Sequence, residues 1–229
     1  MTLKGKRVLG LFAKYWNLGK VKTRLAAKTS DEFACRVHRL FLATTLSRFR
    51  QMADSRHLVF APANSRQPLV DSQLCRDWTL TAQCEGDLGR RMCSFLDQCI
   101  RNDGDRVVLI GADSPHLPAE TIEQAFESLQ DHEVVIGPSD DGGYYLIGMT
   151  VLVSSVFENI AWSTATVFDH TVERLKQLGH SYEVLPSWYD VDELSDLERL
   201  AADLETSQHD PSLACLKSEL AAITATGGP

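Results

Sequence analysis

One carboxylate stands at the end of the most apolar stretch of the chain. Four aliphatic residues at 107–110 lead through Gly111 and Ala112 to Asp113, Ser114 and Pro115. Such a continuous run is typical of a strand buried on both faces of a parallel sheet, and the glycine and the Ser-Pro pair predict its end. Ligands of open α/β sheets bind outside the carboxyl ends of the strands. Asp113 is therefore a candidate ligand of a hard cation such as Mg²⁺, and an aspartate that caps the following turn is the alternative.

A cationic segment follows the first apolar run of the chain. Its cations are Lys14, Lys20, Lys22 and Arg24, they stand around Gly19, and no acid lies among them. Phosphate groups need positive charge and a close approach to the backbone, which glycine and a helix N-terminus provide, and arginine adds a two-point contact. The Walker pattern GxxxxGK[ST] is absent. We interpret the segment as a phosphate-binding loop, with a solvated basic helix start as the alternative.

Two acidic segments occur later in the chain. The first, Asp140-Asp141-Gly142-Gly143, follows a predicted strand and has the composition of an ordinary turn, but its glycines would also let a sugar or another acceptor approach the backbone. In the second, Asp190 and Asp192 lie on the same side of an extended segment. Two acids on one side are costly unless they are solvated, cap a helix or hold a cation, and these interpretations stay open.

The charge distribution indicates which class of ligand the protein binds. The first 30 residues carry eight cations and no acid, whereas the rest of the chain holds 15 cations and 31 acids, a net charge of −16. A basic patch on an acidic protein favours a small anionic ligand over a nucleic acid, which needs a broad positive face.

Cysteine usage and hydropathy indicate the compartment. The six cysteines show no CxxC pair and no metal-ligand spacing, as expected of small apolar residues in a reducing cytoplasm. The apolar run at 8–13 is too short for a signal peptide, and the uncharged stretch at 142–157 is too short to span a membrane. We therefore predict a soluble cytoplasmic protein.

Apolar runs alternate with helical periodicity along the chain, which predicts an α/β fold with a mixed, mostly parallel sheet. Only residues 138–143 separate two of the strands, too few for a parallel crossover, so at least one strand should run against the others. The length of 229 residues favours a single domain with a core at about 7–205. The pattern predicts strands near 7–13, 57–61, 78–82, 106–112, 133–137, 144–149 and 182–185, and helices near 30–52, 66–75, 88–100, 118–129, 168–178, 194–204 and 210–223.

These segments, taken together and in this order, resemble the DUF2064 family of bacterial proteins in the nucleotide-diphospho-sugar transferase (GT-A fold) superfamily. The match spans about residues 7–205. The segments that carry it are FAK at 12–14, GKVKTRL at 19–25, GDLGRR at 86–91, GADSP at 111–115, GPSDDGGYYLIG at 137–148, WST at 162–164 and YDVD at 189–192.

The resemblance implies a three-layer α/β/α sandwich and a site made by several of these segments. It implies a nucleotide between the first loop and the 86–92 segment, and a divalent cation, Mg²⁺ or Mn²⁺, on Asp113. Asp192 would be the second ligand by similarity, with Asp190 as the other possibility. The expected catalytic residues are Lys22 and Asp113, and the expected substrate-binding residues are Lys14, Gly19, Lys20, Arg24, Gly86, Asp87, Arg90, Asp141, Gly142 and Gly143.

We therefore expect a transferase that uses an activated nucleotide, an NTP or an NDP-sugar, and a small-molecule acceptor, without nucleic acid. The cations of the first loop favour nucleotidyl transfer, because a triphosphate needs more neutralising charge, whereas the family resemblance favours glycosyl transfer. A nucleotide-binding module of the same fold without catalytic activity is the alternative.

Overall fold

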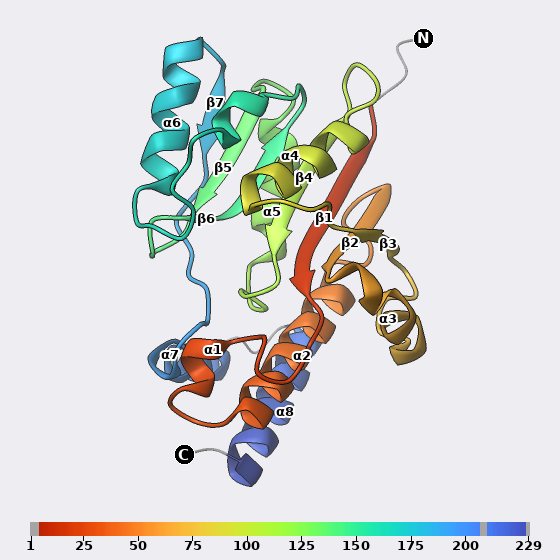
Figure 1. Ribbon diagram of the computed structural model, residues 1–229, viewed down its shortest axis with the longest axis vertical. Coiled ribbons are helices and arrows are strands. Elements are labelled where there is room, and N and C mark those ends of the chain that lie inside the picture. Colours follow the sequence, from red (N-terminus) through yellow and green to blue (C-terminus); the bar gives the residue numbers. More distant parts are fainter. Residues whose placement is uncertain (1–4, 207–209, 228–229) are drawn as a thin grey trace.

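A seven-stranded sheet forms the centre of the molecule (Figure 1). The computed structural model describes residues 5–206 and 210–227. The strand order is β3-β2-β1-β4-β6-β5-β7, and β6 is antiparallel to both of its neighbours while every other pair is parallel. The predicted mixed, mostly parallel sheet is thus confirmed, and β6 is the reversed strand that the short 138–143 connection requires. The strands are β1 (Arg7–Lys14), β2 (Ser55–Ala61), β3 (Thr79–Ala82), β4 (Arg106–Gly111), β5 (Val134–Pro138), β6 (Tyr144–Met149) and β7 (Tyr182–Val184).

Most helices lie where the apolar periodicity predicts them. Two helices begin at an N-cap residue. Ser30 Oγ accepts a hydrogen bond from the Phe33 N–H at the start of α2, and Asp87 accepts one from the Arg90 N–H at the start of α4. The four-residue α1 and the 3₁₀ turns Ala63–Ser65 and Ser154–Phe157 were not predicted, because one turn is too short to show a period. The α-helices are α1 (Thr23–Ala26), α2 (Asp31–Arg48), α3 (Arg66–Ser72), α4 (Leu88–Cys99), α5 (Ala119–Ser128), α6 (Val167–Leu178), α7 (Leu194–Thr206) and α8 (Pro211–Gly227).

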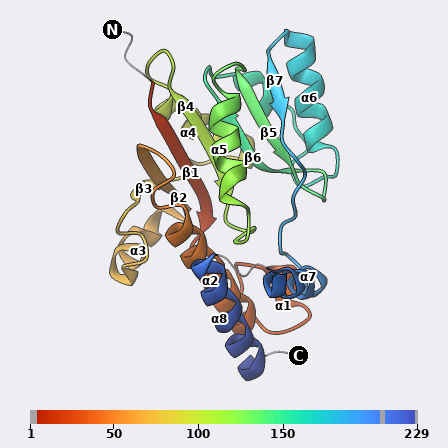
Figure 2. The same cartoon turned by 180° about the vertical axis from the view of Figure 1, so that it is seen from behind.

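The helices cover both faces of the sheet, which makes the expected three layers. One face packs against α2, α3 and α5 through side chains such as Leu46, Leu69 and Phe126. The other face packs against α4 and α6 through Phe95 and Leu175. Figure 1 and the opposite view in Figure 2 show these two helical layers in turn.

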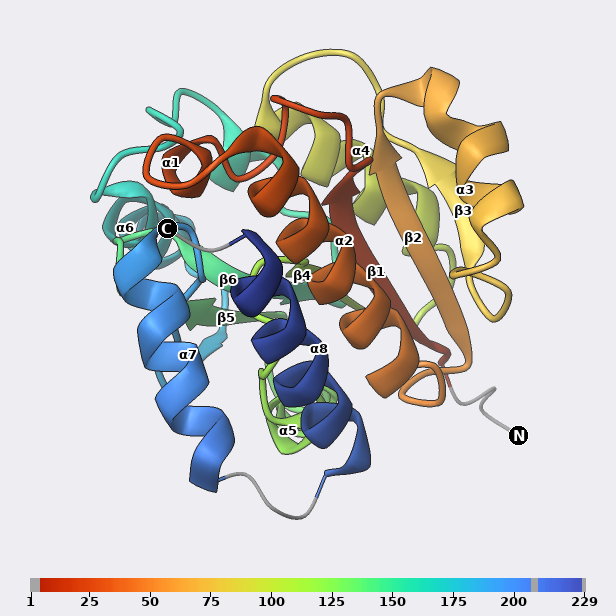
Figure 3. The same ribbon diagram turned by 90° about the horizontal axis from the view of Figure 1, so that it is seen from below.

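A third apolar cluster lies beyond the carboxyl ends of the central strands. It joins α1, α2, α7 and α8, and Figure 3 shows α2, α7 and α8 from this end. Leu25 of α1, Phe41 of α2 and Val191, which precedes α7, are all buried in it. This cluster therefore holds the first loop against the segment that carries Asp190 and Asp192. Among the residues described, no helix is both long and apolar enough to cross a membrane.

Candidate functional site

An open cleft of about 650 Å³ lies at the carboxyl ends of β1 and β4. Its walls come from seven segments that are distant in sequence: the end of β1 with the first loop, His38 of α2, the start of α4 with the residues before it, the end of β4, the start of β6, Ser163, and residues 190–192. This is the edge of an open α/β sheet at which ligands bind. The cleft therefore contains most of the chemistry-bearing residues that the sequence singles out.

Lys22 is the centre of the polar network in the cleft. Its side chain is only 1% exposed, and its Nζ contacts Asp113 Oδ1, lies 3.0 Å from Asp192 Oδ1 and donates a 2.7 Å hydrogen bond to the Val191 carbonyl. Its backbone has a φ of 46°, in the left-handed region that non-glycine residues seldom adopt. Strain of this kind is tolerated where the surrounding structure fixes the residue, as the three partners do here.

The ion pairs control the charge states of this network. Burial by itself would lower the pKa of Lys22, but Asp113 and Asp192 raise it above its usual value. Burial would likewise raise the pKa of Asp113, but the charge of Lys22 lowers it. The ammonium of Lys22 and the carboxylate of Asp113 are thus charged together at neutral pH.

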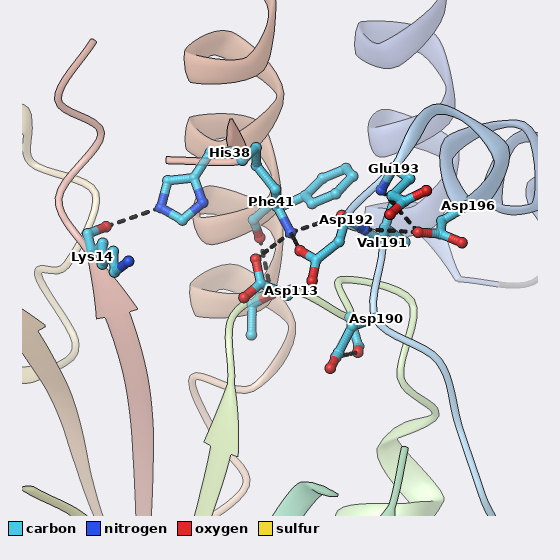
Figure 4. Close-up of polar contacts among 12 residues, drawn as sticks. Lys14, His38, Phe41, Asp113, Asp190, Val191, Asp192, Glu193 and Asp196 are labelled. Atoms are coloured by element: carbon cyan, nitrogen blue, oxygen red, sulfur yellow. Dashed lines mark hydrogen bonds and ion pairs between the residues drawn. The ribbon is translucent and has the colours of Figure 1, made fainter. Parts of the chain in front are cut away.

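Asp190 is a carboxyl of the same segment, and its pKa is raised. Burial, and then the charge of Asp113, raises the pKa of Asp190 to about 7. Ser114 Oγ lies 2.6 Å from Asp190 Oδ1 and 2.9 Å from the Tyr189 carbonyl oxygen. A protonated Asp190 can donate to Ser114 while Ser114 donates to Tyr189. Figure 4 shows Asp113, Asp190 and Asp192 approaching one another from two segments of the chain.

The helix-cap interpretation of Asp192 is not what the structure shows. Asp196, in the first turn of α7, accepts hydrogen bonds from the Asp192 and Glu193 N–H groups at 3.0 and 2.8 Å. The Asp192 carboxylate is therefore free of capping and contacts Lys22. Asp113, too, contacts Lys22 through its carboxylate rather than the turn that follows it.

Asp113 and Asp192 form a donor set that fits a divalent cation. Their side chains are about 40% exposed and both line the cleft, so both acids are accessible to a ligand there. In the described part of the chain, no three His, Cys, Asp or Glu side chains are placed to share a metal ion. Mg²⁺ is commonly held by one or two carboxylates together with substrate phosphates, and these two acids suit that mode of binding.

His38 is a cleft residue that the sequence analysis did not single out. Its Nε2 lies 2.9 Å from the Lys14 carbonyl oxygen, so this nitrogen carries the proton and fixes the start of the first loop (Figure 4). Burial lowers its pKa, which keeps the ring neutral. The helical periodicity of the sequence could have identified His38 as a buried residue, because Ala34, His38 and Leu42 are four residues apart on a buried face of α2.

The expected site residues separate into two groups. Lys14, Lys22, Arg24, Gly86, Asp87, Asp113 and Asp192 line the cleft. The others do not line it, and they are Gly19, Lys20, Arg90, Asp141, Gly142 and Gly143. At the start of α4 the cleft is lined by Arg91 instead of Arg90, and Arg91 Nε donates to the Gly86 carbonyl at 2.9 Å.

The turn at 139–143 uses its polar groups internally. Asp141 contacts Ser139 Oγ and accepts a 3.0 Å hydrogen bond from the Gly143 N–H. Gly142 has a φ of +87°, and its carbonyl accepts a hydrogen bond from the Phe168 N–H at 2.9 Å. These contacts are those of a structural turn beside the cleft, and an acceptor role for it stays a prediction.

Comparison with known proteins places this chain in a family. The model of DUF2064, described as an uncharacterized protein conserved in bacteria, matches residues 45–164, more than half of the chain. The chain belongs to the DUF2064 family. No curated protein matches this DUF2064 chain. Of the solved structures, a candidate nucleotide-diphospho-sugar transferase from Desulfovibrio desulfuricans G20 is 31% identical, with a TM-score of 0.85 over 96% of this chain and 97% of its own.

More distant structures share the fold of this DUF2064 protein. An inositol-1-phosphate CTP transferase from T. maritima is 15% identical, with a TM-score of 0.52 over 96% of this chain and 98% of its own. A manganese complex of Rv0371c from Mycobacterium tuberculosis H37Rv is 15% identical, with a TM-score of 0.50 over 84% of this chain and 96% of its own. The nucleotide-diphospho-sugar transferase-like fold is therefore confirmed.

Proposed function

We propose that this DUF2064 protein is a transferase that moves a group from an NTP or an NDP-sugar to a small acceptor with the help of a divalent cation, Mg²⁺ or Mn²⁺. The observation that carries the proposal is the pairing of Lys22 with Asp113 and Asp192 inside a cleft that also contains Lys14 and Arg24. Two of the similar structures are transferases by name, and a third is a manganese complex, and these support the proposal.

Two cations that line the cleft would bind the phosphates of the nucleotide. Lys14 and Arg24 line the cleft, and neither is buried, so both can reach an anionic ligand. Asp87 caps α4, whose N-terminal N–H groups face the same cleft and favour negative charge. The nucleotide would thus lie between the first loop and the start of α4.

Asp113 and Asp192 would hold the cation, and Lys22 would keep the two acids at a fixed separation. A bound divalent cation offsets the negative charge that develops on the leaving phosphate. Asp192 is a better second ligand than Asp190, because Asp190 is bonded to Ser114 and its pKa lies near 7. Lys22 also adds positive charge that needs no reorganisation during the reaction.

Two reactions fit this site. In nucleotidyl transfer, an acceptor phosphate oxygen bonds to the α-phosphorus of an NTP, the bond between the α- and β-phosphates breaks, and pyrophosphate leaves. In glycosyl transfer, an acceptor hydroxyl oxygen bonds to the anomeric carbon of an NDP-sugar, the bond from that carbon to phosphate breaks, and the NDP leaves. In the latter, the hydroxyl proton passes to a carboxylate of the site or to solvent.

A ligand panel with an active-site variant tests the proposal. The melting temperature is measured with NTPs and NDP-sugars, with and without Mg²⁺ or Mn²⁺, because a ligand that binds the native state raises it. Asp113→Asn should still bind nucleotide but lose turnover by at least about 100-fold. The exposed Asp103 serves as the matched control, and Asp103→Asn should change neither nucleotide binding nor turnover. Undiminished turnover by Asp113→Asn would refute the role of this acid, and nucleotide binding without turnover by the wild type would indicate a binding module.

A further inference from the structure

β1 and β4 separate from each other at the cleft. Their pairing ends at Phe12 and Gly111, whereas β1 stays paired with β2 as far as Lys14 and Ala61. The Tyr15 N–H donates to the Ala61 carbonyl of β2 at 2.7 Å. Successive residues of a strand direct their backbone groups to opposite edges, so the Lys14 carbonyl points away from β2, to the side on which β4 has ended. This edge of β1 has therefore lost its neighbouring strand.

Groups from outside the sheet bond to both strand ends where they separate. On the β1 side, the His38 Nε2–H donates to the Lys14 carbonyl at 2.9 Å (Figure 4). On the β4 side, the Val191 N–H donates to the Asp113 carbonyl at 3.0 Å. A backbone carbonyl that has lost its strand partner needs another donor, so each bond stabilises the strand end that it contacts. Helix α2 therefore holds one wall of the cleft, and the 190–192 segment holds the other.

The surroundings of His38 fix its position. It is 4% exposed and belongs to the 18-residue helix α2, in which its neighbour Val37 is also buried. A side chain that is locked on a helix positions a functional residue more precisely than a loop does. Its other ring nitrogen, Nδ1, is buried and has no hydrogen-bond partner among the described residues. A ligand in the cleft cannot reach this nitrogen, so the ring acts on the cleft through its bond to Lys14.

Lys14 and Asp113 lie on the two walls that these bonds hold. Lys14 is exposed and lines the cleft, and Asp113, the proposed cation ligand, lines it from the other side. A phosphate chain contacts both the ammonium and the cation only when the two strand ends keep a fixed separation. A displacement of about 1 Å in such an arrangement can lower a reaction rate about 100-fold. The bond from His38 to the end of β1 is thus placed to control this separation.

We propose that His38 is a positioning residue that aligns Lys14 with Asp113 for the binding of a diphosphate group, which an NTP and an NDP-sugar both contain. This inference rests on the proposed function and adds to it a residue that contacts neither the nucleotide nor the cation. Because it concerns the phosphates alone, it applies to nucleotidyl transfer and to glycosyl transfer alike.

Two amide variants isolate the hydrogen bond of His38 from the polarity of its side chain. The amide nitrogen of a glutamine superposes on Nε2 of the ring, whereas that of an asparagine superposes on Nδ1 and does not reach Lys14. The probe is inorganic pyrophosphate with Mg²⁺, and calorimetry gives its dissociation constant. His38→Asn should weaken binding about 10-fold, and His38→Gln should stay within about 3-fold of the wild type. Equal weakening by the two variants would overturn the proposal.

A double-mutant cycle tests whether the effect passes through Lys14. Lys14→Met should by itself weaken pyrophosphate binding about 10-fold, and the loss should stay near about 10-fold when His38→Asn is added, because the ammonium that His38 aligns is already absent. Arg24 provides the comparison, since it lines the same cleft but belongs to α1. The effects of Arg24→Met and His38→Asn should multiply to about 100-fold. Multiplied effects with Lys14→Met as well would show that His38 does not act through Lys14 and would overturn the proposal.

The outcomes separate this inference from the proposed function. Should the wild type bind neither pyrophosphate nor any nucleotide, the proposed function itself would fail. Nucleotide binding without pyrophosphate binding, or equal binding of pyrophosphate by the wild type and a folded His38→Asn, would refute only the positioning role. The melting temperature of each variant without ligand shows whether it is folded. Should His38→Asn not fold, His38→Leu, which fills the buried position without a donor, takes its place in the cycle with the same expected results.

Discussion

Lys22 and Asp192 are 170 positions apart in the sequence, yet Lys22 Nζ lies 3.0 Å from Asp192 Oδ1. The same ammonium contacts Asp113, so one buried cation joins the first loop, the end of β4 and the segment before α7. Lys14, Arg24, Gly86 and Asp87, which the sequence predicted for the site, line the same cleft.

Lys22→Met should destabilise the protein at pH 7 by roughly 1–3 kcal/mol, because Asp113 and Asp192 lose the charge that compensates them. Because the pKa of Lys22 is raised in the native state, its contribution to the free energy of unfolding is complete below its usual pKa of 10.5. This contribution is lost as the pH rises through the pKa that Lys22 has in the native state. Because the pKa of Asp113 is lowered in the native state, its contribution to the free energy of unfolding is complete above its usual pKa of 3.8. This contribution is lost as the pH falls through the pKa that Asp113 has in the native state.

The interaction should therefore be complete between about pH 4 and pH 10, and urea unfolding of wild type and variant across this range measures it. Lys28→Met provides the control, because Lys28 is exposed and outside the cleft. Equal stabilities of the wild type and Lys22→Met at pH 7 would contradict the prediction.

Asp190→Asn should be more stable than the wild type above neutral pH when no metal is present. A carboxyl whose native pKa is about 7 binds more protons in the native state than in the unfolded state, so the wild type loses stability as the pH rises from about 4 to 7. The variant has no such dependence at this position, and the gain has an upper limit of about 4 kcal/mol, at roughly 1.4 kcal/mol for each pKa unit.

Unfolding in urea at pH 5 and pH 8, with EDTA, gives the two differences in the free energy of unfolding. The gain should be larger at pH 8 than at pH 5, and Asp103→Asn, at an exposed position, is measured in parallel as the control substitution. A difference that grows toward low pH has the wrong sign and would rule out a raised pKa.

Arg48 should be among the most sensitive positions outside the cleft. Its side chain is 5% exposed, its Nη1 donates to the Pro115 and Leu117 carbonyls at 2.7 and 2.9 Å, and its Nε donates to Asp210 at 2.9 Å. Arg48→Met should cost about 3–5 kcal/mol, because it leaves these acceptors and a carboxylate without their donor.

Arg48→Lys should recover only part of this loss, since an ammonium cannot reproduce the fork of the guanidinium. The neighbouring Arg50 is exposed, and within residues 5–206 and 210–227 its side chain bonds only to Ser47, so Arg50→Met should change the unfolding free energy by less than about 0.5 kcal/mol. Similar costs at the two positions would mean that the buried contacts of Arg48 contribute nothing.

Gly142→Ala should destabilise the protein more than Gly179→Ala. Both glycines have positive φ, of +87° and +75°, and the backbone strain of an alanine is of the order of 1–2 kcal/mol at either. A Cβ on Gly142 would also lie 2.2 Å from the Ala165 carbonyl oxygen, whereas a Cβ on Gly179 meets no atom within 4 Å. Thermal unfolding of the two variants isolates the steric part, and equal melting temperatures would show that the turn moves freely away from residue 165.

The sequence by itself determined the layers and the direction of the strands. The apolar run at 107–110, ended by Gly111 and the Ser-Pro pair, is typical of a strand buried on both faces, and it is β4 in the structure. The six-residue gap before β6 required a reversed strand, since a parallel crossover does not fit into it. These are local constraints on chain length and side-chain period, and they can be read without knowledge of the packing.

Only the tertiary structure decided what each polar residue contacts. Lys22 was expected among phosphate-binding cations, and the fold instead buries it between two acids that the sequence places 91 and 170 positions away. Asp190 and Asp192 are equivalent by alternation, but Asp190 contacts Ser114 and Asp192 contacts Lys22, and burial together with the charge of Asp113 raises the pKa of Asp190. Ion pairing, burial and the shift of a pKa depend on distances between segments, and the order of residues along one segment does not contain those distances.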